Sequence, residues 1–335
     1  MNNPLISVIL PFFNAGKSLS RSIASIAHQT YENIEIILIN NNSTDDSLSI
    51  AYGWVKKDDR IRIINEPRQG VAFASNAGSK EAKGTYIARM DADDETLPDR
   101  LKIQADFLEK NPDIDAVGGL VEYTGKVAKN EGMKKYVDWA NKIITAGEIK
   151  INRFIDLPVI NPTAMWRKEA EKKYGLFVHG DFPEDYEMWL RWMAQGANIA
   201  KVNHIILKWH DSENRLTRTN PSYRDEAFYM VKTKYLYSWL QKRNPLYPSV
   251  NVWGASKISR KRAKMLENLG INIDNYIDIK KTRQIDTNII YHKDIPPPGK
   301  MFILVYVRQW NAKKQIKQFL QSRGYSEGKD YLFIS

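Results

Sequence analysis

The chain contains no cysteine. Disulfide bonds, thiolate metal sites and a cysteine nucleophile are therefore excluded, which fits a reducing compartment. Long hydrophobic runs are also missing, since the longest late one, Met301–Val307, is far too short to span a bilayer. The first residues lack the charged and then apolar pattern of a signal peptide. We therefore expect a cytoplasmic protein.

What is present suits a chain of two globular domains. Its 335 residues are 43% hydrophobic, enough for sizeable cores. The net charge is +11, of which +9 comes from residues 250–335, with 16 Lys and Arg against 7 Asp and Glu. Such a basic segment would allow peripheral contact with the inner face of a membrane. Charge at this level is most often a solvated surface, so we expect no nucleic-acid partner.

The first part of the chain alternates short apolar runs with helical patterns. Such strand and helix repeats build a parallel sheet with helices on its faces. The runs that predict strands are 6–10, 34–39, 61–64, 86–90 and 115–123. The segments whose apolar spacing predicts helices are 18–29, 71–82, 99–109, 139–151, 184–195 and 222–242. A pair of strands is expected within 199–209.

Polar clusters follow three of the predicted strands, at 11–14, 40–42 and 91–94. Because ligands of such sheets bind beyond the carboxyl ends of the strands, we expect these clusters to meet in one crevice. The last cluster holds three carboxylates, Asp91, Asp93 and Asp94. Like charges this close repel unless a cation offsets them, and oxygen ligands suit Mg²⁺ or Mn²⁺. An acidic turn that caps the next helix is the alternative, and these residues alone do not decide.

A second, smaller α/β unit follows a break near Pro245. We place the boundary so that residues 1–243 and 244–335 form two domains. The strand 250–253 leads into Gly254 and a helix, and Asp278 ends the next strand, as in a Rossmann-like unit. The turn reads GASKIS and lacks the glycines of a dinucleotide site, so we expect no cofactor there. Oligomerisation, positioning of a substrate and surface docking stay open as its tasks.

Five stretches in this order and spacing carry a resemblance to a known family. They are ISVILPFFN (6–14), SIASIAHQTYENIEIILINNNSTDDS (22–47), GVAFASNAG (70–78), AKGTYIARMDADD (82–94) and PEDYEMWLR (183–191). Residues 5 to about 215 thereby resemble a family 2 glycosyltransferase of the GT-A fold. The resemblance implies an α/β domain with a mostly parallel sheet flanked by helices, followed here by the Rossmann-like unit.

The same resemblance implies a metal-dependent sugar transfer from a nucleotide-diphosphate-sugar donor. A divalent ion, Mg²⁺ or Mn²⁺, stabilises the charge that develops on the leaving diphosphate. By resemblance Asp93 contacts the ion, Asp91 faces the ribose or a metal-bound water, and Asp94 supports the ion or the loop. His210 stands where relatives have a histidine that completes the metal shell. A structural histidine after a strand is the alternative for this residue.

The acceptor hydroxyl must lose a proton as it attacks, which a nearby carboxylate achieves. Resemblance gives this role to Asp185, with Glu184 as the local competitor. The alternative is that both acids merely occupy the first turn of a helix, where the dipole favours them. The implied reaction is a single displacement with inversion at the sugar carbon.

The nucleotide pocket is where this chain departs from its relatives. Family members commonly have an aspartate pair where Asn40 and Asn41 stand, and an arginine where Ser75 stands. An amide offers a donor and an acceptor instead of two acceptors, so a donor other than a uridine nucleotide becomes plausible. The residues that we assign to the nucleotide-sugar by resemblance are Pro11, Phe13, Asn14, Asn41, Arg68, Asn76, Asp91 and Ala92.

The leading hypothesis is an inverting glycosyltransferase that serves cell-surface polysaccharide assembly, with a glycan or a lipid-linked acceptor. An oligomer is compatible with the sequence. The runner-up is a nucleotide-sugar-binding or scaffold protein of the same fold that has lost catalysis, motivated by Asn40, Asn41 and Ser75. Trp189 and Trp192 stand three residues apart on a helix, which predicts core packing and argues against sugar stacking.

Overall fold

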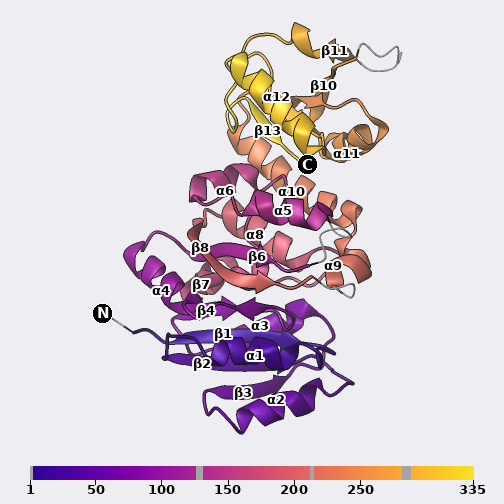
Figure 1. The fold of residues 1–335 in the computed structure, drawn as a ribbon. Helices are drawn as coiled ribbons and strands as arrows, with labels where there is room; N and C mark the ends of the chain where they lie inside the picture. The colour runs from indigo at the N-terminus through magenta and orange to yellow at the C-terminus, as the bar shows by residue number, and fades with distance from the viewer. Residues whose placement is uncertain (1–2, 126–130, 212–214, 281–287) are drawn as a thin grey trace. The chain divides into compact units, whose positions relative to one another are not determined.

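The computed structural model describes residues 3–125, 131–211, 215–280 and 288–335 (Figure 1). They form two compact units that are each described by themselves. The first consists of Met1–Ile149 and Pro158–Arg224, and the second of Lys150–Leu157 and Asp225–Ser335. The long helix α10 (Asp225–Arg243) thus belongs to the second unit, whereas the predicted boundary after residue 243 places it in the first domain.

The first unit is built on an eight-stranded mixed sheet in the order β3-β2-β1-β4-β7-β6-β8-β5. Its strands are β1 (Ile6–Phe12), β2 (Ile34–Asn40), β3 (Ile61–Asn65), β4 (Tyr86–Arg89), β5 (Glu95–Thr96), β6 (Ala116–Tyr123), β7 (Met165–Arg167) and β8 (Ile199–Trp209). Its helices are α1 (Leu19–Ala27), α2 (Ser47–Val55), α3 (Val71–Glu81), α4 (Arg100–Lys110), α5 (Glu131–Ala140), α7 (Lys168–Tyr174), α8 (Glu184–Ala194) and α9 (Leu216–Thr219). Helix α6 (Ala146–Asn152) crosses from the first unit into the second.

Strands β1 to β4 form the parallel half of this sheet, as predicted. All seven residues of β1 are buried, which explains its nearly continuous apolar sequence. Helix α3 packs against β1 and β2. A Cβ at Gly78 would lie only 2.8 Å from Cδ1 of Ile39, so glycine is what allows the helix to approach the sheet this closely.

In the other half of the sheet, β6 and β8 keep the direction of β1 to β4, and only β7 and β5 run the opposite way. β7 pairs antiparallel with β4 and with β6, and β5 pairs antiparallel with β8, whereas β6 and β8 are parallel. The expected strand pair within 199–209 is one long strand, β8. The expected helix at 139–151 is wrong as a single element, because α5 ends at Ala140 and α6 begins at Ala146. Residues 126–130, which precede α5, lie outside the described residues.

The tryptophans of α8 are core residues, as predicted from their spacing. Trp189 and Trp192 are fully buried and make edge-to-face contacts with the buried Trp166 of β7. Aromatic rings in this arrangement add specific packing energy to their burial. None of these three side chains is therefore exposed for stacking on a sugar.

The second unit has a five-stranded parallel sheet in the order β11-β10-β9-β12-β13. Its strands are β9 (Ser249–Trp253), β10 (Asn272–Asp278), β11 (Ile289–Tyr291), β12 (Ile303–Val305) and β13 (Tyr331–Phe333), and its helices besides α10 are α11 (Lys257–Glu267) and α12 (Trp310–Ser322). The predicted smaller Rossmann-like α/β unit is confirmed. No helix among the described residues is both long and apolar enough to cross a bilayer.

Candidate functional site

The three acids predicted to act together lie side by side just beyond β4. One carboxylate oxygen from each of Asp91, Asp93 and Asp94 lies within 4.8 Å of the others. The side chains of Asp91 and Asp93 keep 28% and 35% of their surface exposed, whereas Asp94 is fully buried. Asp91 and Asp93 can therefore contact a ligand that arrives from solvent, whereas Asp94 lies in the interior beside them.

Arg215 supplies the positive charge nearest to the two later acids. Its Nη2 lies 3.6 Å from Oδ2 of Asp94 and its Nε 3.7 Å from Oδ2 of Asp93, and its guanidinium packs 4.1 Å from the ring centre of Trp209. Burial raises the pKa of Asp94 well above its usual range and also raises that of Asp93, and Arg215 opposes both shifts. Burial lowers the pKa of Arg215, but Asp94 and Asp93 outweigh it, so this pKa is raised.

Two further arginines hold the strand that carries these acids. Arg89, the last residue of β4, is buried and places Nη2 2.7 Å from Oδ1 of Asp91. Arg100 of α4 is also buried and donates from Nη2 to the carbonyl of Arg89 at 2.8 Å. Burial lowers the pKa of Arg100 to about 9, with Asp94 acting in the opposite direction. The acids therefore project from a strand end fixed by buried hydrogen bonds.

Main-chain hydrogen bonds fix the turn itself. Oγ of Ser22 in α1 donates to the carbonyls of Asp91 and Asp94, and Nη2 of Arg21 donates to the carbonyl of Asp93 at 2.6 Å. The main-chain N–H of His210 donates to Oδ1 of Asp94 at 2.9 Å. Because Asp91, Asp93 and Asp94 are held by residues of α1 and by His210, the carboxylates are positioned before any ligand arrives.

The ring of His210 points toward Thr124 and Glu95 and not toward the three aspartates of the cluster. Nδ1 lies 2.9 Å from Oγ1 of Thr124, and Nε2 lies 3.6 Å from Oε2 of Glu95. Burial, followed by the charge of Arg21, lowers the pKa of His210. Its ring nitrogens are not among the atoms that form the acidic cluster in the described part of the chain. In this structure His210 therefore positions Asp94 through its main chain, and ligation of an ion by its ring stays a prediction.

The polar clusters that follow β1 and β2 converge beside β4, as predicted. Phe12 pairs with Asn40 in the sheet, and β1 also pairs with β4. Pro11 is buried within β1, while Phe13, the next residue after that strand, exposes 49% of its surface. Asn14 has φ 48° and accepts from the N–H of Thr44 at 2.8 Å. Phe13 is thus an exposed aromatic ring at the sheet edge, on which a base can stack.

Asn41 uses its whole amide to hold the loop 66–70. Its Nδ2 donates to the carbonyls of Glu66 and Arg68 at 2.9 and 2.8 Å. Its Oδ1 accepts from the N–H of Gly70 at 2.8 Å and from Nε2 of Gln69 at 3.4 Å. Two donors and two acceptor positions are all that this side chain has. Asparagine at this position therefore serves the loop, and its amide has no capacity left for a base in this structure.

Replacing Asn41 by aspartate is expected to lower the free energy of unfolding by about 1–3 kcal/mol, because a carboxylate cannot donate to the two carbonyls. Denaturant unfolding of both proteins measures the difference. Asn42→Asp is the matched control, since Asn42 is exposed and water can replace its hydrogen bond to the carbonyl of Pro67. Equal losses in the two variants would contradict the role given to Asn41.

Two other residues assigned to the nucleotide also have protein partners. Arg68 donates to both carboxylate oxygens of Glu66 at 2.8 Å, and this pairing lowers the pKa of Glu66 to about 2. The Arg68 side chain still exposes 60% of its surface. Asn76 exchanges two hydrogen bonds with the main chain of Phe177, at 2.8 and 3.0 Å. Arg68 can reach an anion from its exposed side, whereas Asn76 joins α3 to the segment before α8.

The two acids that begin α8 have different surroundings. Glu184 is buried, and its Oε2 accepts from the hydroxyl of Tyr223 at 2.5 Å. Burial raises the pKa of Glu184. The charge of Arg89 opposes this shift, and the charge of Asp91 adds to it. Asp185 is only half-buried, and its Oδ1 accepts from the N–H of Tyr186 at 2.7 Å. Of the two acids, Asp185 is therefore the more accessible to a substrate, and the start of α8 lies within the electrostatic reach of the acidic cluster.

Sequence reasoning missed Arg215, Tyr223 and the holding role of Arg89. Arg215 follows Trp209 by six positions with no motif of its own, and its aromatic contact appears only once β8 is folded. Arg89 did carry a signal, because a charged residue inside an otherwise apolar strand is retained only when it is paired. Ala92, also assigned to the nucleotide, is half-buried and packs against the core.

Comparisons with known proteins agree with this architecture. The family described as Glycosyl transferase family 2 matches residues 7–175. An uncharacterised glycosyltransferase of Haemophilus influenzae (strain ATCC 51907 / DSM 11121 / KW20 / Rd) is 32% identical over 72% of this chain and 76% of its own length. The uncharacterised glycosyltransferase EpsJ of Bacillus subtilis (strain 168) is 26% identical over 97% of this chain and 98% of its own.

Among solved structures, TarS 1-349 of S. aureus in complex with UDP-GlcNAc is similar in fold. The TM-score is 0.55 at 18% identity, over 78% of this chain and 70% of that one. At this identity the likeness concerns the fold alone. The fold of this chain therefore has a counterpart of known structure.

Proposed function

Since the chain belongs to glycosyl transferase family 2, we propose that it moves a sugar from a nucleotide-diphosphate-sugar donor to an acceptor hydroxyl with inversion. The observation that carries this proposal is the acidic cluster beyond β4, with an accessible carboxylate at the start of α8. The acidic cluster suits a metal-bound diphosphate, and the carboxylate at the start of α8 suits removal of a proton. Membership of this family makes the chain a glycosyltransferase. The proposal adds the class of donor, the divalent ion and inversion at the sugar carbon.

A divalent ion, Mg²⁺ or Mn²⁺, fits the residues present. Three carboxylates supply hard oxygen ligands within 4.8 Å of one another, and Asp91 and Asp93 keep exposed surface for a ligand. When bound, such an ion would offset the negative charge of the departing diphosphate. Asp93 would hold it directly, with Asp91 beside it, while Asp94 would fix the turn from its buried position.

Asp185 would act as the base. Its carboxylate would accept the proton of the acceptor hydroxyl while the oxygen of that hydroxyl forms a bond to the anomeric carbon. The bond from that carbon to the diphosphate breaks in the same step, so no bond to the enzyme forms. The competing acid, Glu184, already accepts a hydrogen bond from Tyr223 in a buried position. That environment supports assigning proton transfer to Asp185.

Donor binding would use the edge formed by β1, β2 and β4. Phe13 would offer its exposed ring to the base, Pro11 and Asn14 would lie beneath the donor, and Arg68 would offer an exposed cation to a phosphate. Asn41 would act indirectly, by holding the loop 66–70. Because the amide of Asn41 is fully used, main-chain groups would have to recognise the base. Both uridine and other nucleotides therefore stay possible as donors.

The acceptor is proposed to be a glycan or a lipid-linked sugar in cell-surface polysaccharide assembly, which is a typical task for this family. Peripheral contact with the inner face of a membrane would follow from the basic charge of residues 250–335. The enzyme would work in the cytoplasm, where its donor is made. Oligomer formation stays a prediction.

The experiment that tests the proposal compares donors directly. The protein is incubated with UDP-, GDP-, dTDP- or CMP-sugars, with and without Mn²⁺, and release of the nucleotide is measured together with the shift in melting temperature. We expect one nucleoside diphosphate sugar to raise the melting temperature only with Mn²⁺ present and to be turned over. Binding without any turnover would instead support a catalytically inactive nucleotide-sugar-binding or scaffold protein of the same fold.

Replacing Arg215 by methionine is expected to make the protein more dependent on Mn²⁺ for stability. Without this guanidinium, Asp93 and Asp94 lose their nearest cation, so the metal-free variant should melt at a lower temperature and gain more from added Mn²⁺ than the wild type. Differential scanning calorimetry measures both effects. Arg62→Met, which removes an arginine paired with Glu35 and Glu81, is the control. An identical gain from Mn²⁺ in both variants would contradict the role of Arg215.

A further inference from the structure

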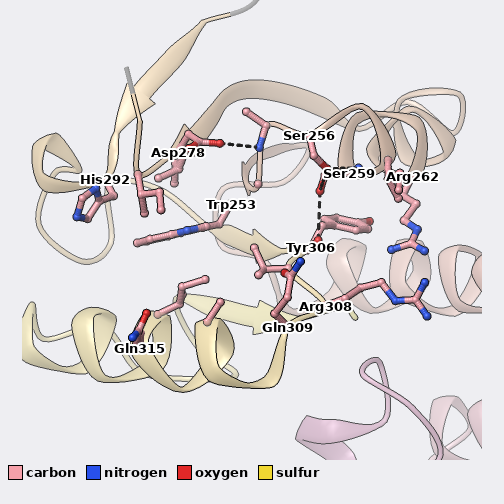
Figure 2. Close-up of a pocket in the computed structure, with 18 of the residues that line it drawn as sticks. Trp253, Ser256, Ser259, Arg262, Asp278, His292, Tyr306, Arg308, Gln309 and Gln315 are labelled. Carbon is pink, nitrogen blue, oxygen red and sulfur yellow. Dashed lines mark hydrogen bonds between the residues drawn. The ribbon is translucent and has the colours of Figure 1, made fainter. Parts of the chain in front are cut away.

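The second unit contains a pocket of about 490 Å³ that the transfer reaction does not use (Figure 2). This volume lies within the range of about 300–1,000 Å³ typical of small-molecule sites. Residues from the carboxyl ends of β9, β10 and β12 line it, together with residues of α11 and α12. Two isoleucines on its lining, Ile258 and Ile279, expose 60% and 61% of their surface. Apolar side chains left open at a pocket are positions that a bound molecule would cover.

The pocket lies where the order of the sheet changes direction. From β9 the chain passes to β10 and β11 on one side, and β12 and β13 lie on the other side. In open parallel sheets, ligands bind at the carboxyl ends of the strands on either side of such a switch. The fold therefore provides a crevice at this edge, and the lining residues decide what it can hold.

Asp278, the last residue of β10, is the charged acceptor of this pocket. Its Oδ2 accepts from the N–H of Ala255 at 3.3 Å, and its Oδ1 accepts from the N–H of Lys280 at 3.0 Å. No salt bridge links it to a cation in the described part of the second unit. Each carboxylate oxygen keeps a further lone pair for a donor. Two neighbouring hydroxyls, such as the 2′ and 3′ hydroxyls of a ribose, match this pair of acceptors, and an acid in this position binds ribose in related folds.

Aromatic rings form another wall of the pocket. Trp253 ends β9 and packs edge-to-face on Phe319 of α12, with centroids 5.7 Å apart, and His292 lies 5.2 Å from the same Phe319. In Figure 2, Trp253 lies between Asp278 and Gln315. Trp253 is buried and supports Phe319, whose half-buried ring can pack against a planar base, and glutamine amides can hydrogen-bond to the edge of that base.

Two main-chain donors of the turn after β9 are already used within the protein. The N–H of Ala255 is directed to Asp278, and the N–H of Ser259 donates to Oγ of Ser256 at 3.1 Å. These are main-chain donors near the start of a helix, where a phosphate would otherwise bind. The negative charge of Asp278 beside Ala255 disfavours a phosphate further. The two arginines on the lining, Arg262 and Arg308, both pair with Asp225, so a ligand with a ribose and a base but no diphosphate suits the pocket best.

We propose that this pocket binds a ribonucleoside, with Asp278 accepting from the two ribose hydroxyls and the half-buried ring of Phe319 packing against the base. This proposal does not depend on the proposed transfer reaction, because none of its residues belongs to the first unit. The turn GASKIS, which lacks the glycines of a dinucleotide site, does not oppose a ribonucleoside.

The test is calorimetric titration of the full chain with adenosine, guanosine, cytidine and uridine, each beside its 2′,3′-dideoxy counterpart. We expect one ribonucleoside to bind and its dideoxy form to bind at least about tenfold more weakly, because the charged hydrogen bonds are lost. Asp278→Asn should weaken the ribonucleoside by a similar factor. Asp274→Asn, on the exposed part of the same strand, is the matched control and should bind as the wild type does.

A second variant separates loss of the site from loss of the fold. Ile279→Trp places bulk at an exposed position of the pocket and should weaken binding at least about tenfold without altering the melting temperature. The proposal is overturned if none of the four ribonucleosides binds to the wild type. It is equally overturned if binding is unchanged in both Asp278→Asn and Ile279→Trp, since the nucleoside would then lie elsewhere, including in the donor site.

Discussion

Replacing Asp93 by asparagine is expected to reduce sugar transfer by about 10²–10³-fold and to weaken Mn²⁺ binding in the absence of donor. The neutral amide keeps the size of the side chain but removes the charge that would hold the ion against the diphosphate. Steady-state transfer assays measure the first effect, and electron paramagnetic resonance of free Mn²⁺ measures the second. Because the second readout needs no turnover, it separates loss of the metal from loss of the fold.

A matched aspartate serves as the control for this substitution. Asp106 lies on α4, pairs with Lys102 at 2.7 Å on the surface, and has no contact with the acidic cluster. Asp106→Asn should leave both transfer and Mn²⁺ binding within twofold of the wild type, since exposed pairs contribute little. If Asp93→Asn behaves in the same way as Asp106→Asn, the metal proposal is wrong.

Replacing Asp185 by asparagine is expected to lower kcat by about 10²–10⁴-fold while the donor still binds. The reason is that only proton removal from the acceptor is lost, and the diphosphate is held by residues of the other cluster. Transfer to an acceptor and donor binding are measured separately, the latter by calorimetry with Mn²⁺. Loss of both properties together would point to a collapsed helix start instead of a missing base.

Glu184→Gln is the informative comparison for Asp185→Asn. The amide can still meet the Tyr223 hydroxyl, so the buried pair is kept in altered form. We expect this variant to change the melting temperature more than kcat, because Glu184 is buried and Asp185 is half-buried. A larger fall in kcat for Glu184→Gln than for Asp185→Asn would reverse the two assignments.

Most of the first unit was predictable because local and long-range signals agree there. The runs that became β1, β2 and β4 are apolar and end at polar residues, so their parallel order and common edge followed from the rules of strand connection. The antiparallel part was less predictable, because β7 has only three residues and carries Arg167. Its place between β4 and β6 depends on tertiary packing, which no short pattern encodes.

The residues of the candidate site also differ in how far the sequence alone predicts their positions. Asp91, Asp93 and Asp94 are adjacent in sequence, so their proximity needed no tertiary knowledge. The engagement of Asn41 with the loop 66–70 and the position of Arg215 depend on segments that meet only in the folded chain. The direction of the His210 ring also depends on Thr124 and Glu95, which lie far from it in sequence.

The saturated amide of Asn41 has a consequence for changing donor preference by design. A substitution at this position alone removes supports of the loop before it can offer a new contact to a base. The side chain at position 41 and the loop 66–70 therefore have to match each other. A design for a new donor should therefore exchange residue 41 and the loop 66–70 together. The new side chain at position 41 should form hydrogen bonds to the new loop.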